Sequence, residues 1–149
     1  MILTGRELEG YKYDVKIRHI RVIDFLISEK FKNEFLTLDG GILAIEKGYA
    51  WDGSSIPGKK YIKRLTLGFI DCDRYCKKAS LVHDAICQSM RGGLLDKKYK
   101  EQADGLYRDM CIQGGMGKRE ANFRYWGLRK FGDHKFKRKV KPRGKVFET

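Results

Sequence analysis

Three residues in the middle of the chain have the types and the spacing of an acid–base centre. His83 and Asp84 are adjacent, and Asp104 follows 20 residues after Asp84. A carboxylate that reaches an imidazole fixes the tautomer of the ring and raises its basicity. We therefore expect any chemistry of this protein to centre on His83, Asp84 and Asp104.

The first element that carries these residues is a predicted helix. It begins at Asp71 or Asp73, either of which can cap a helix, and it runs to about Met90. His83 lies at the edge of its apolar stripe, so the ring is expected to face a neighbouring helix rather than bulk water. The stripe consists of apolar residues at helical spacing: Cys76, Ala79, Val82, Ile86 and Met90.

A second helix is predicted from Asp96 to about Gln113, ending at a pair of glycines. About five residues join the two helices, so they are expected to pack antiparallel. Asp104 then lies at the edge that corresponds to His83, and the small residues Ala79 and Ala103 let the backbones approach. A non-catalytic interpretation stays open, in which His83 and Asp104 only hold the two helices together.

Asp84 lies about 100° further round the first helix than His83, so it points to an adjacent rim, where it can hold a cation or a water. Asp52 is a second carboxylate, in a loop rich in glycine and serine from Gly48 to Gly58. Ligation by Asp52 and Asp84 beside His83 would favour calcium, magnesium or manganese over zinc. Asp52 can equally cap backbone N–H groups of its own turn.

The remaining segments predict an α+β fold: a small N-terminal antiparallel sheet followed by three helices, the first two an antiparallel pair. A half-buried strand is predicted by the alternation of residues 13–22, and further short strands surround a turn at Asp39–Gly41. These further strands are Phe25–Ile27, Phe35–Leu38 and Ile42–Ile45. The third helix is predicted at Lys118–Phe131. We expect one α+β domain over residues 1–131 and a basic tail over 132–149.

The charge is uneven along the chain. The net charge is +13, yet residues 1–57 hold 8 basic and 9 acidic residues, and residues 58–149 hold 24 and 10. Between Lys118 and Lys145, basic residues alternate with aromatic ones, which favours an anionic partner: nucleic acid, membrane phosphate or an acidic protein surface. The alternative is that the helical part docks on the core through Ala121, Tyr125 and Leu128.

Composition excludes several classes of protein. With 149 residues, 42% hydrophobic and 34% charged, the chain suits one soluble globular domain. No run approaches the roughly 18 to 20 apolar residues of a membrane span, and no signal-peptide core follows Met1.

The other histidines and two of the cysteines carry separate expectations. His19 and His134 are expected to be solvated. Cys76 and Cys111 lie seven residues from His83 and Asp104, which predicts that they share a level of the helix pair.

The helix pair resembles the active-site helices of secreted calcium-dependent phospholipases, and more closely the phospholipase-type domain of parvovirus capsid proteins. The resemblance rests on Ala79-x-x-x-His83-Asp84-Ala85-Ile86-Cys87 followed by Ala103-Asp104. It implies that His83 activates water, that Asp84 ligates calcium and that Asp104 orients the histidine. Those families carry a glycine-rich calcium loop upstream, for which this chain offers only Asp52–Ser55, about 30 residues before His83.

A second resemblance covers roughly residues 13–115, to a domain-of-unknown-function family found mainly in tailed bacteriophages and prophages. The matching residues are Gly48, Tyr49, Asp52, Gly53, Ser55, Ile56, Pro57, Ala79, His83, Asp84, Ala103 and Asp104. It implies a phage setting, with synthesis in the host cytoplasm and association with a virion. Two functions are therefore expected: a phage-encoded hydrolase with a phospholipid ester as substrate, or a non-catalytic accessory or virion protein whose basic third binds a partner.

Overall fold

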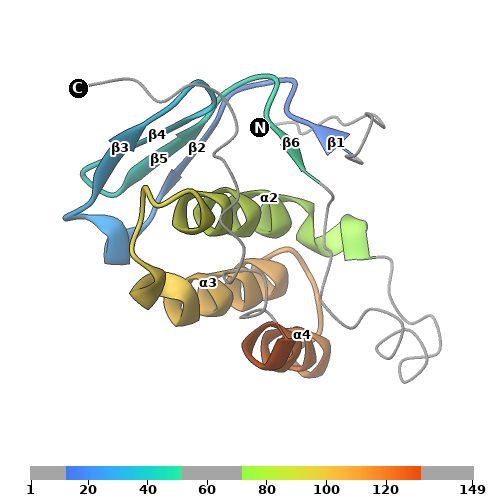
Figure 1. Ribbon diagram of the computed structural model, residues 1–149. Helices are drawn as coiled ribbons and strands as arrows, with labels where there is room; N and C mark the ends of the chain where they lie inside the picture. Colours follow the sequence, from blue (N-terminus) through green and yellow to red (C-terminus); the bar gives the residue numbers. More distant parts are fainter. Residues whose placement is uncertain (1–12, 52–71, 132–149) are drawn as a thin grey trace.

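The computed structural model describes residues 13–51 and 72–131. Asp52, Asp71, His134 and the whole predicted tail from 132 lie outside the described residues. A four-stranded antiparallel sheet and three α-helices account for most of the described part (Figure 1). The predicted α+β class, with a small sheet followed by three helices, is confirmed.

The four strands of the main sheet stand in the order β2-β5-β4-β3, with every pair antiparallel. Gly40 and Gly41 join β4 to β5 with φ values of 58° and 81°. Two consecutive residues with positive φ are typical of the tight hairpin turn that suits the twist of paired strands, which confirms the predicted turn. The bounds are β2 His19–Val22, β3 Lys30–Lys32, β4 Leu36–Asp39 and β5 Ile42–Ile45.

The single strand predicted over residues 13–22 is wrong. Two strands occupy this range: β1 (Tyr13–Asp14) pairs with β6 (Ala50–Trp51), and β2 pairs with β5. The reason is a change of phase, because apolar residues stand at odd positions up to Ile17 and at even positions from Ile20. One continuous strand would place the two sets on opposite faces. The chain instead bends between them.

Two further predictions about the sheet are also wrong. Phe25–Ile27 is not a strand, because the short 3₁₀ helix η1 (Asp24–Leu26) turns the chain there and buries Leu26. His19, expected in solvent, is 7% exposed, because it lies on the inward face of β2 while Ile20 and Val22 point outward at 53% and 64%. Burial, with the positive charges of Lys78 and Arg21, lowers the pKa of His19.

The three α-helices follow the predicted order: α2 (Cys72–Arg91), α3 (Lys100–Gln113) and α4 (Lys118–Phe131). The backbone of α2 departs from helical angles at Cys76, and Asp73 lies inside the helix rather than before it. Asp96 forms the predicted cap by accepting a hydrogen bond from the backbone N–H of Lys98 at 2.8 Å. The turn that it caps is the 3₁₀ helix η2 (Lys97–Tyr99), which leads into α3.

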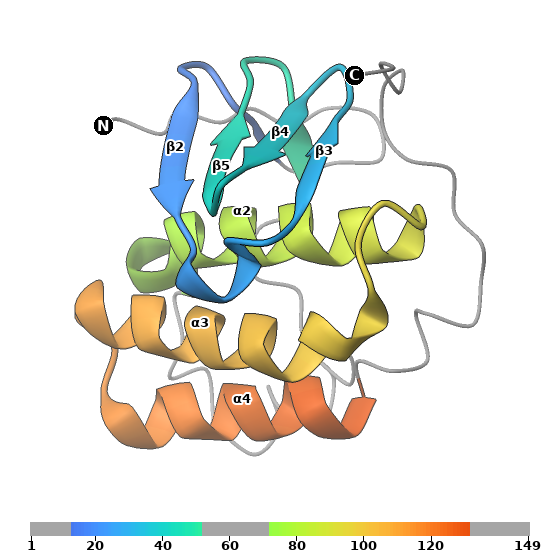
Figure 2. The same ribbon diagram turned by 90° about the vertical axis from the view of Figure 1, so that its left-hand side faces the viewer.

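The elements stack in layers. The sheet covers one side of α2, α3 lies against the other side, and α4 packs beyond α3 (Figures 1 and 2). The chain reverses between α2 and α3, so the two helices run antiparallel as predicted (Figure 2). Because α3 has a helix on either side, even its polar residues Lys100 and Asp104 are buried.

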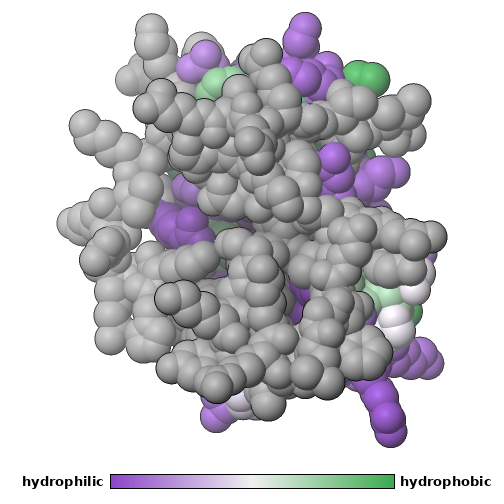
Figure 3. Space-filling view, turned by 90° about the vertical axis from the view of Figure 1, so that its right-hand side faces the viewer, coloured by the Kyte–Doolittle hydropathy of each residue, from purple (hydrophilic) through white to green (hydrophobic). Residues whose placement is uncertain are grey.

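On the face shown in Figure 3, hydrophilic residues outnumber hydrophobic ones among those that carry colour, as the 34% of charged residues would lead one to expect. Among the residues that the structure describes, no helix combines the length and the apolar character needed to cross a membrane.

Candidate functional site

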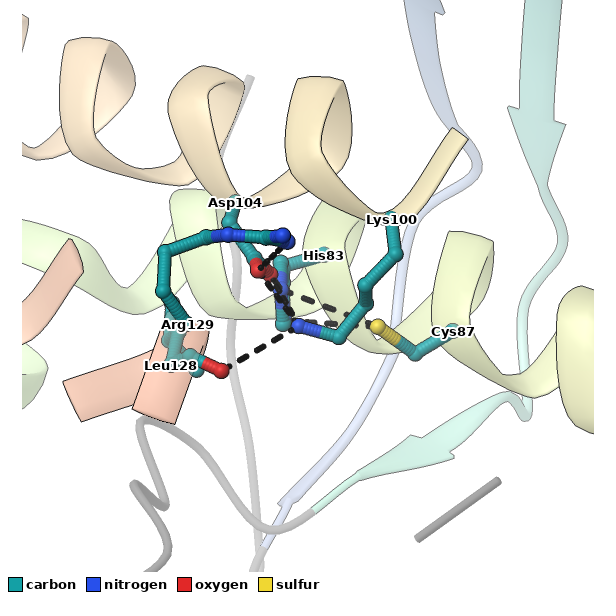
Figure 4. A network of polar contacts seen from close by, with 6 residues as sticks. All are labelled: His83, Cys87, Lys100, Asp104, Leu128 and Arg129. Atoms are coloured by element: carbon teal, nitrogen blue, oxygen red, sulfur yellow. Dashed lines mark hydrogen bonds and ion pairs between the residues drawn. The ribbon is translucent and has the colours of Figure 1, made fainter. Parts of the chain in front are cut away.

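The predicted contact between α2 and α3 is present. The Nε2 atom of His83 lies 2.7 Å from the Oδ1 atom of Asp104 (Figure 4). Ala79 and Ala103, the small residues predicted to let the backbones approach, are 2% and 0% exposed. Two residues 21 positions apart are thus joined by a direct hydrogen bond across the helix interface.

Asp104 accepts hydrogen bonds from two further cations. Lys100, one turn earlier on α3, places its Nζ 2.6 Å from Oδ1 and also contacts Oδ2, and Arg129 of α4 places Nη1 3.1 Å from Oδ2 (Figure 4). Lys100 also reaches the backbone oxygen of Leu128 at 3.5 Å. This network, which we call the Asp104 cluster (His83, Lys100, Asp104 and Arg129), joins all three α-helices.

The carboxyl of Asp104 is ionised in this setting. Its side chain is fully buried, which by itself raises its pKa, but the hydrogen bonds and charges of His83 and Lys100 outweigh burial and lower the pKa. A buried carboxylate without such donors would take up a proton instead. Asp104 is therefore a negative charge held at a fixed point beside the imidazole.

His83 carries a positive charge at neutral pH. Burial of the ring disfavours that charge, but the neighbouring Cys87 and the Asp104 carboxylate outweigh burial and raise the pKa to about 9. The Cys87 sulfur lies 3.8 Å from Nδ1 and 3.6 Å from Nε2. The ring of Tyr107 meets the imidazole edge-on, with 5.4 Å between centroids. His83 can accept a proton only after it has released the one it holds.

The two ends of the pair differ in their access to solvent. The side chain of His83 is 14% exposed, whereas that of Asp104 is 0% exposed. An orienting carboxylate is expected to be buried behind the histidine, and a catalytic histidine must be reached by its substrate. The carboxylate thus lies on the buried side of the pair, and the imidazole lies on the side nearer to solvent.

Asp84 points to a different partner, as its position round the helix predicts. Its Oδ2 accepts a hydrogen bond of 2.5 Å from the hydroxyl of Tyr49, whose side chain is fully buried. Tyr49 belongs to the sequence motif that continues to Asp52, and its hydrogen bond ties α2 to the residue just before β6. Asp52 itself lies outside the described residues, and its approach to Asp84 stays a prediction.

The described residues alone do not make a metal centre. Within residues 13–51 and 72–131, no group of three or more His, Cys, Asp or Glu side chains is arranged to hold a metal ion. Asp84 is the one member of the predicted ligand set that offers a carboxylate here, since a protonated imidazole does not ligate metals. A calcium ion near Asp84 would depend on oxygen ligands from the Asp52 segment.

Two members of the Asp104 cluster, Lys100 and Arg129, were not predicted, nor was the contact of Cys87 with His83. Lys100 and Cys87 stand four residues from Asp104 and His83 on the same helices, so the i, i+4 rule offered a signal for both. No sequence signal indicated Arg129, because its contact with Asp104 depends on how α4 packs on α3. Cys76 and Cys111, predicted at one level of the helix pair, are both buried thiols.

Replacing Tyr49 with phenylalanine should lower the free energy of unfolding by about 1–2 kcal/mol, because Asp84 loses a hydrogen bond from a buried hydroxyl while the ring is kept. Urea denaturation followed by circular dichroism measures the change. Tyr99→Phe, which removes a comparable bond to Glu29, is the matched control for loss of a tyrosine hydroxyl. An unchanged midpoint in Tyr49→Phe would show that the bond to Asp84 contributes nothing.

Fold and site together define an α+β protein in which a histidine–aspartate pair connects two packed helices. The chain belongs to the family described as "Protein of unknown function (DUF1353)", which matches residues 29–128. That range includes Asp52, His83, Asp84 and Asp104. Membership of a domain-of-unknown-function family is what the sequence motifs predicted. Comparisons with curated proteins and with solved structures gave no match.

Proposed function

We propose that this protein is a hydrolase in which His83, oriented by Asp104, activates water for attack on an ester. The observation that carries the proposal is the 2.7 Å contact between His83 Nε2 and the buried Asp104 carboxylate. This contact leaves Nδ1 as the ring nitrogen that faces away from the orienting group. The resemblance to phospholipases suggests a phospholipid ester as substrate, and the separate resemblance to the phage and prophage family suggests a phage setting for the reaction.

The proton transfers follow from this geometry. Deprotonated His83 takes a proton at Nδ1 from a water molecule, and the water oxygen adds to the ester carbonyl. The tetrahedral intermediate then breaks its bond to the alcohol oxygen, which receives the proton from His83. Asp104 stays ionised throughout and stabilises the imidazolium, while Lys100 and Arg129 hold the carboxylate in place.

The test is release of fatty acid from phosphatidylglycerol vesicles. We expect His83→Gln to lower turnover by about 100-fold or more, the usual effect of removing a general base. The rate of the wild type should rise with pH towards about 9, because only the neutral ring acts as base. Asp109→Asn, an exposed carboxylate on α3, serves as the control. Turnover that is equal in wild type and His83→Gln would exclude the proposal.

A calcium ion at Asp84 and Asp52 is a separate part of the proposal. Titration calorimetry should detect calcium binding by the wild type and its loss in Asp84→Ala. Tyr49→Phe is the matched control, because it removes the same hydrogen bond but leaves the carboxylate. Absence of binding at millimolar calcium would remove the metal from the proposal while leaving the His83 test intact.

One observation favours a second candidate function. The His83–Asp104 pair is part of a larger network across three helices, formed with Lys100, Arg129 and the backbone oxygen of Leu128. Such a network is expected of a group of residues that only stabilises the fold. The protein would then be a non-catalytic accessory or virion protein. In that case His83→Gln should lower stability, and no ester turnover should be found in any variant.

A further inference from the structure

The outer side of α4 carries a row of two cations and two aromatic rings. Arg119, Phe123, Trp126 and Lys130 follow each other at spacings of four, three and four residues, so they lie along one side of the helix. Eleven residues of helix span about 16 Å. We call these four residues the α4 row. It places a positively charged side chain at each end and the aromatic pair between them.

The two aromatic rings contact each other, and Trp126 is exposed while Phe123 is half-buried. The rings of Phe123 and Trp126 are stacked, with 6.1 Å between centroids and 21° between their planes. Trp126 is 47% exposed, which makes it the most exposed large hydrophobic residue of the described helices. Exposure of tryptophan costs free energy, and the exposed part of the indole can contact another planar ring.

The charge on this side of α4 is positive. From Lys118 to Lys130 the helix has five basic residues and one acidic residue, Glu120. Glu120 contacts the buried Arg124 at 3.4 Å, and Arg129 is engaged with Asp104. The exposed cations of the helix are therefore Lys118, Arg119 and Lys130, which are basic side chains presented to solvent around the aromatic pair.

We propose that the α4 row binds single-stranded nucleic acid. Cationic side chains that follow a phosphate backbone, combined with aromatic rings on which bases stack, are the two features that bind single strands without sequence preference. Both features occur here on one described helix face. The cations of the α4 row match the negative phosphates, and its aromatic rings match the flat bases. This proposal does not depend on the proposed hydrolase function.

A membrane surface fits the same helix less well. A helix that lies in a bilayer interface turns a broad apolar face towards the lipid. The aliphatic residues of α4, Ala121 and Leu128, are buried at 0% and 5% exposure, so the apolar side of the helix faces the protein. Phe123 and Trp126 are the only rings that this side of α4 offers to a lipid, whereas a ring pair between cations suits unpaired bases.

The experiment is a fluorescence anisotropy titration of fluorescein-labelled (dT)20 with the full chain. Trp126→Ala should weaken binding by about 5- to 150-fold, the range expected when one stacked base is lost. Trp126→Phe should recover most of the affinity because a ring remains. Ile27→Ala, which removes another exposed hydrophobic side chain at 70% exposure, should bind as the wild type does.

Charge is tested separately by salt dependence. The double variant Arg119→Gln with Lys130→Gln should reduce the slope of log affinity against log salt by about 1.4, at about 0.7 per phosphate contact. The matched control replaces two exposed lysines elsewhere, Lys47→Gln with Lys97→Gln. Failure of the wild type to bind (dT)20, or equal binding by Trp126→Ala, would overturn the proposal. Binding to phosphatidylglycerol vesicles but not to (dT)20 would overturn it in favour of a membrane.

Discussion

Replacing Asp104 with asparagine should lower the free energy of unfolding by about 3–5 kcal/mol, the usual cost of removing one partner from a buried ionic group. The amide keeps the shape of the side chain but removes the negative charge. The fully buried side chain at position 104 would then be neutral, while three cationic side chains still surround it: His83, Lys100 and Arg129. Few single substitutions in this chain should cost as much.

Urea denaturation at pH 7 measures this effect directly. Asp109→Asn is the matched control, because it makes the same chemical change on α3 at an exposed position, and it should stay within about 0.5 kcal/mol of the wild type. A loss of less than about 1 kcal/mol in Asp104→Asn would show that water reaches the Asp104 cluster and screens its charges.

The second large effect is a loss of stability at alkaline pH. The pKa of His83 is raised from 6.5 to about 9 in the folded protein. Between these values the folded state holds a proton that the unfolded state has released, so stability falls as pH rises. The contribution is fully present below pH 6.5 and is lost as pH passes about 9. Its size is about 3 kcal/mol at 1.36 kcal/mol per unit of pKa.

The comparison of wild type with His83→Gln isolates this contribution, because the other groups that titrate above pH 8 are shared. The difference in free energy of unfolding between the two proteins, measured from pH 6 to pH 10, should shrink as pH rises. A difference that is constant across this range, or that grows with pH, would mean that His83 is not protonated in the folded protein at neutral pH.

The contact between His83 and Asp104 was predictable because local patterns determine it. The apolar stripes fix which side of each helix faces inward, the short connection makes the pair antiparallel, and alanines allow close approach. The position of Asp84 followed from helix geometry in the same way. Arg129 was not predictable, because it reaches Asp104 from a third helix whose packing depends on the whole fold.

The sheet shows where pattern alone fails. Alternation shows that two faces differ, but it does not show which face the protein covers. His19 and Arg21 lie on the inner side of β2, and Ile20 and Val22 lie on the outer side, the reverse of what polarity indicates. The helix layer beneath the sheet decides this orientation, and that layer comes later in the sequence.

The measurement that most directly tests the pairing of His83 with Asp104 as one acid–base unit is an NMR titration of the His83 ring. The spectrum of His83→Gln assigns its signals among the three histidines of the chain. We expect a midpoint near pH 9, and a lower midpoint in Asp104→Asn, provided that this variant is folded. A midpoint at or below 6.5 in the wild type would contradict the coupling of His83 to Asp104.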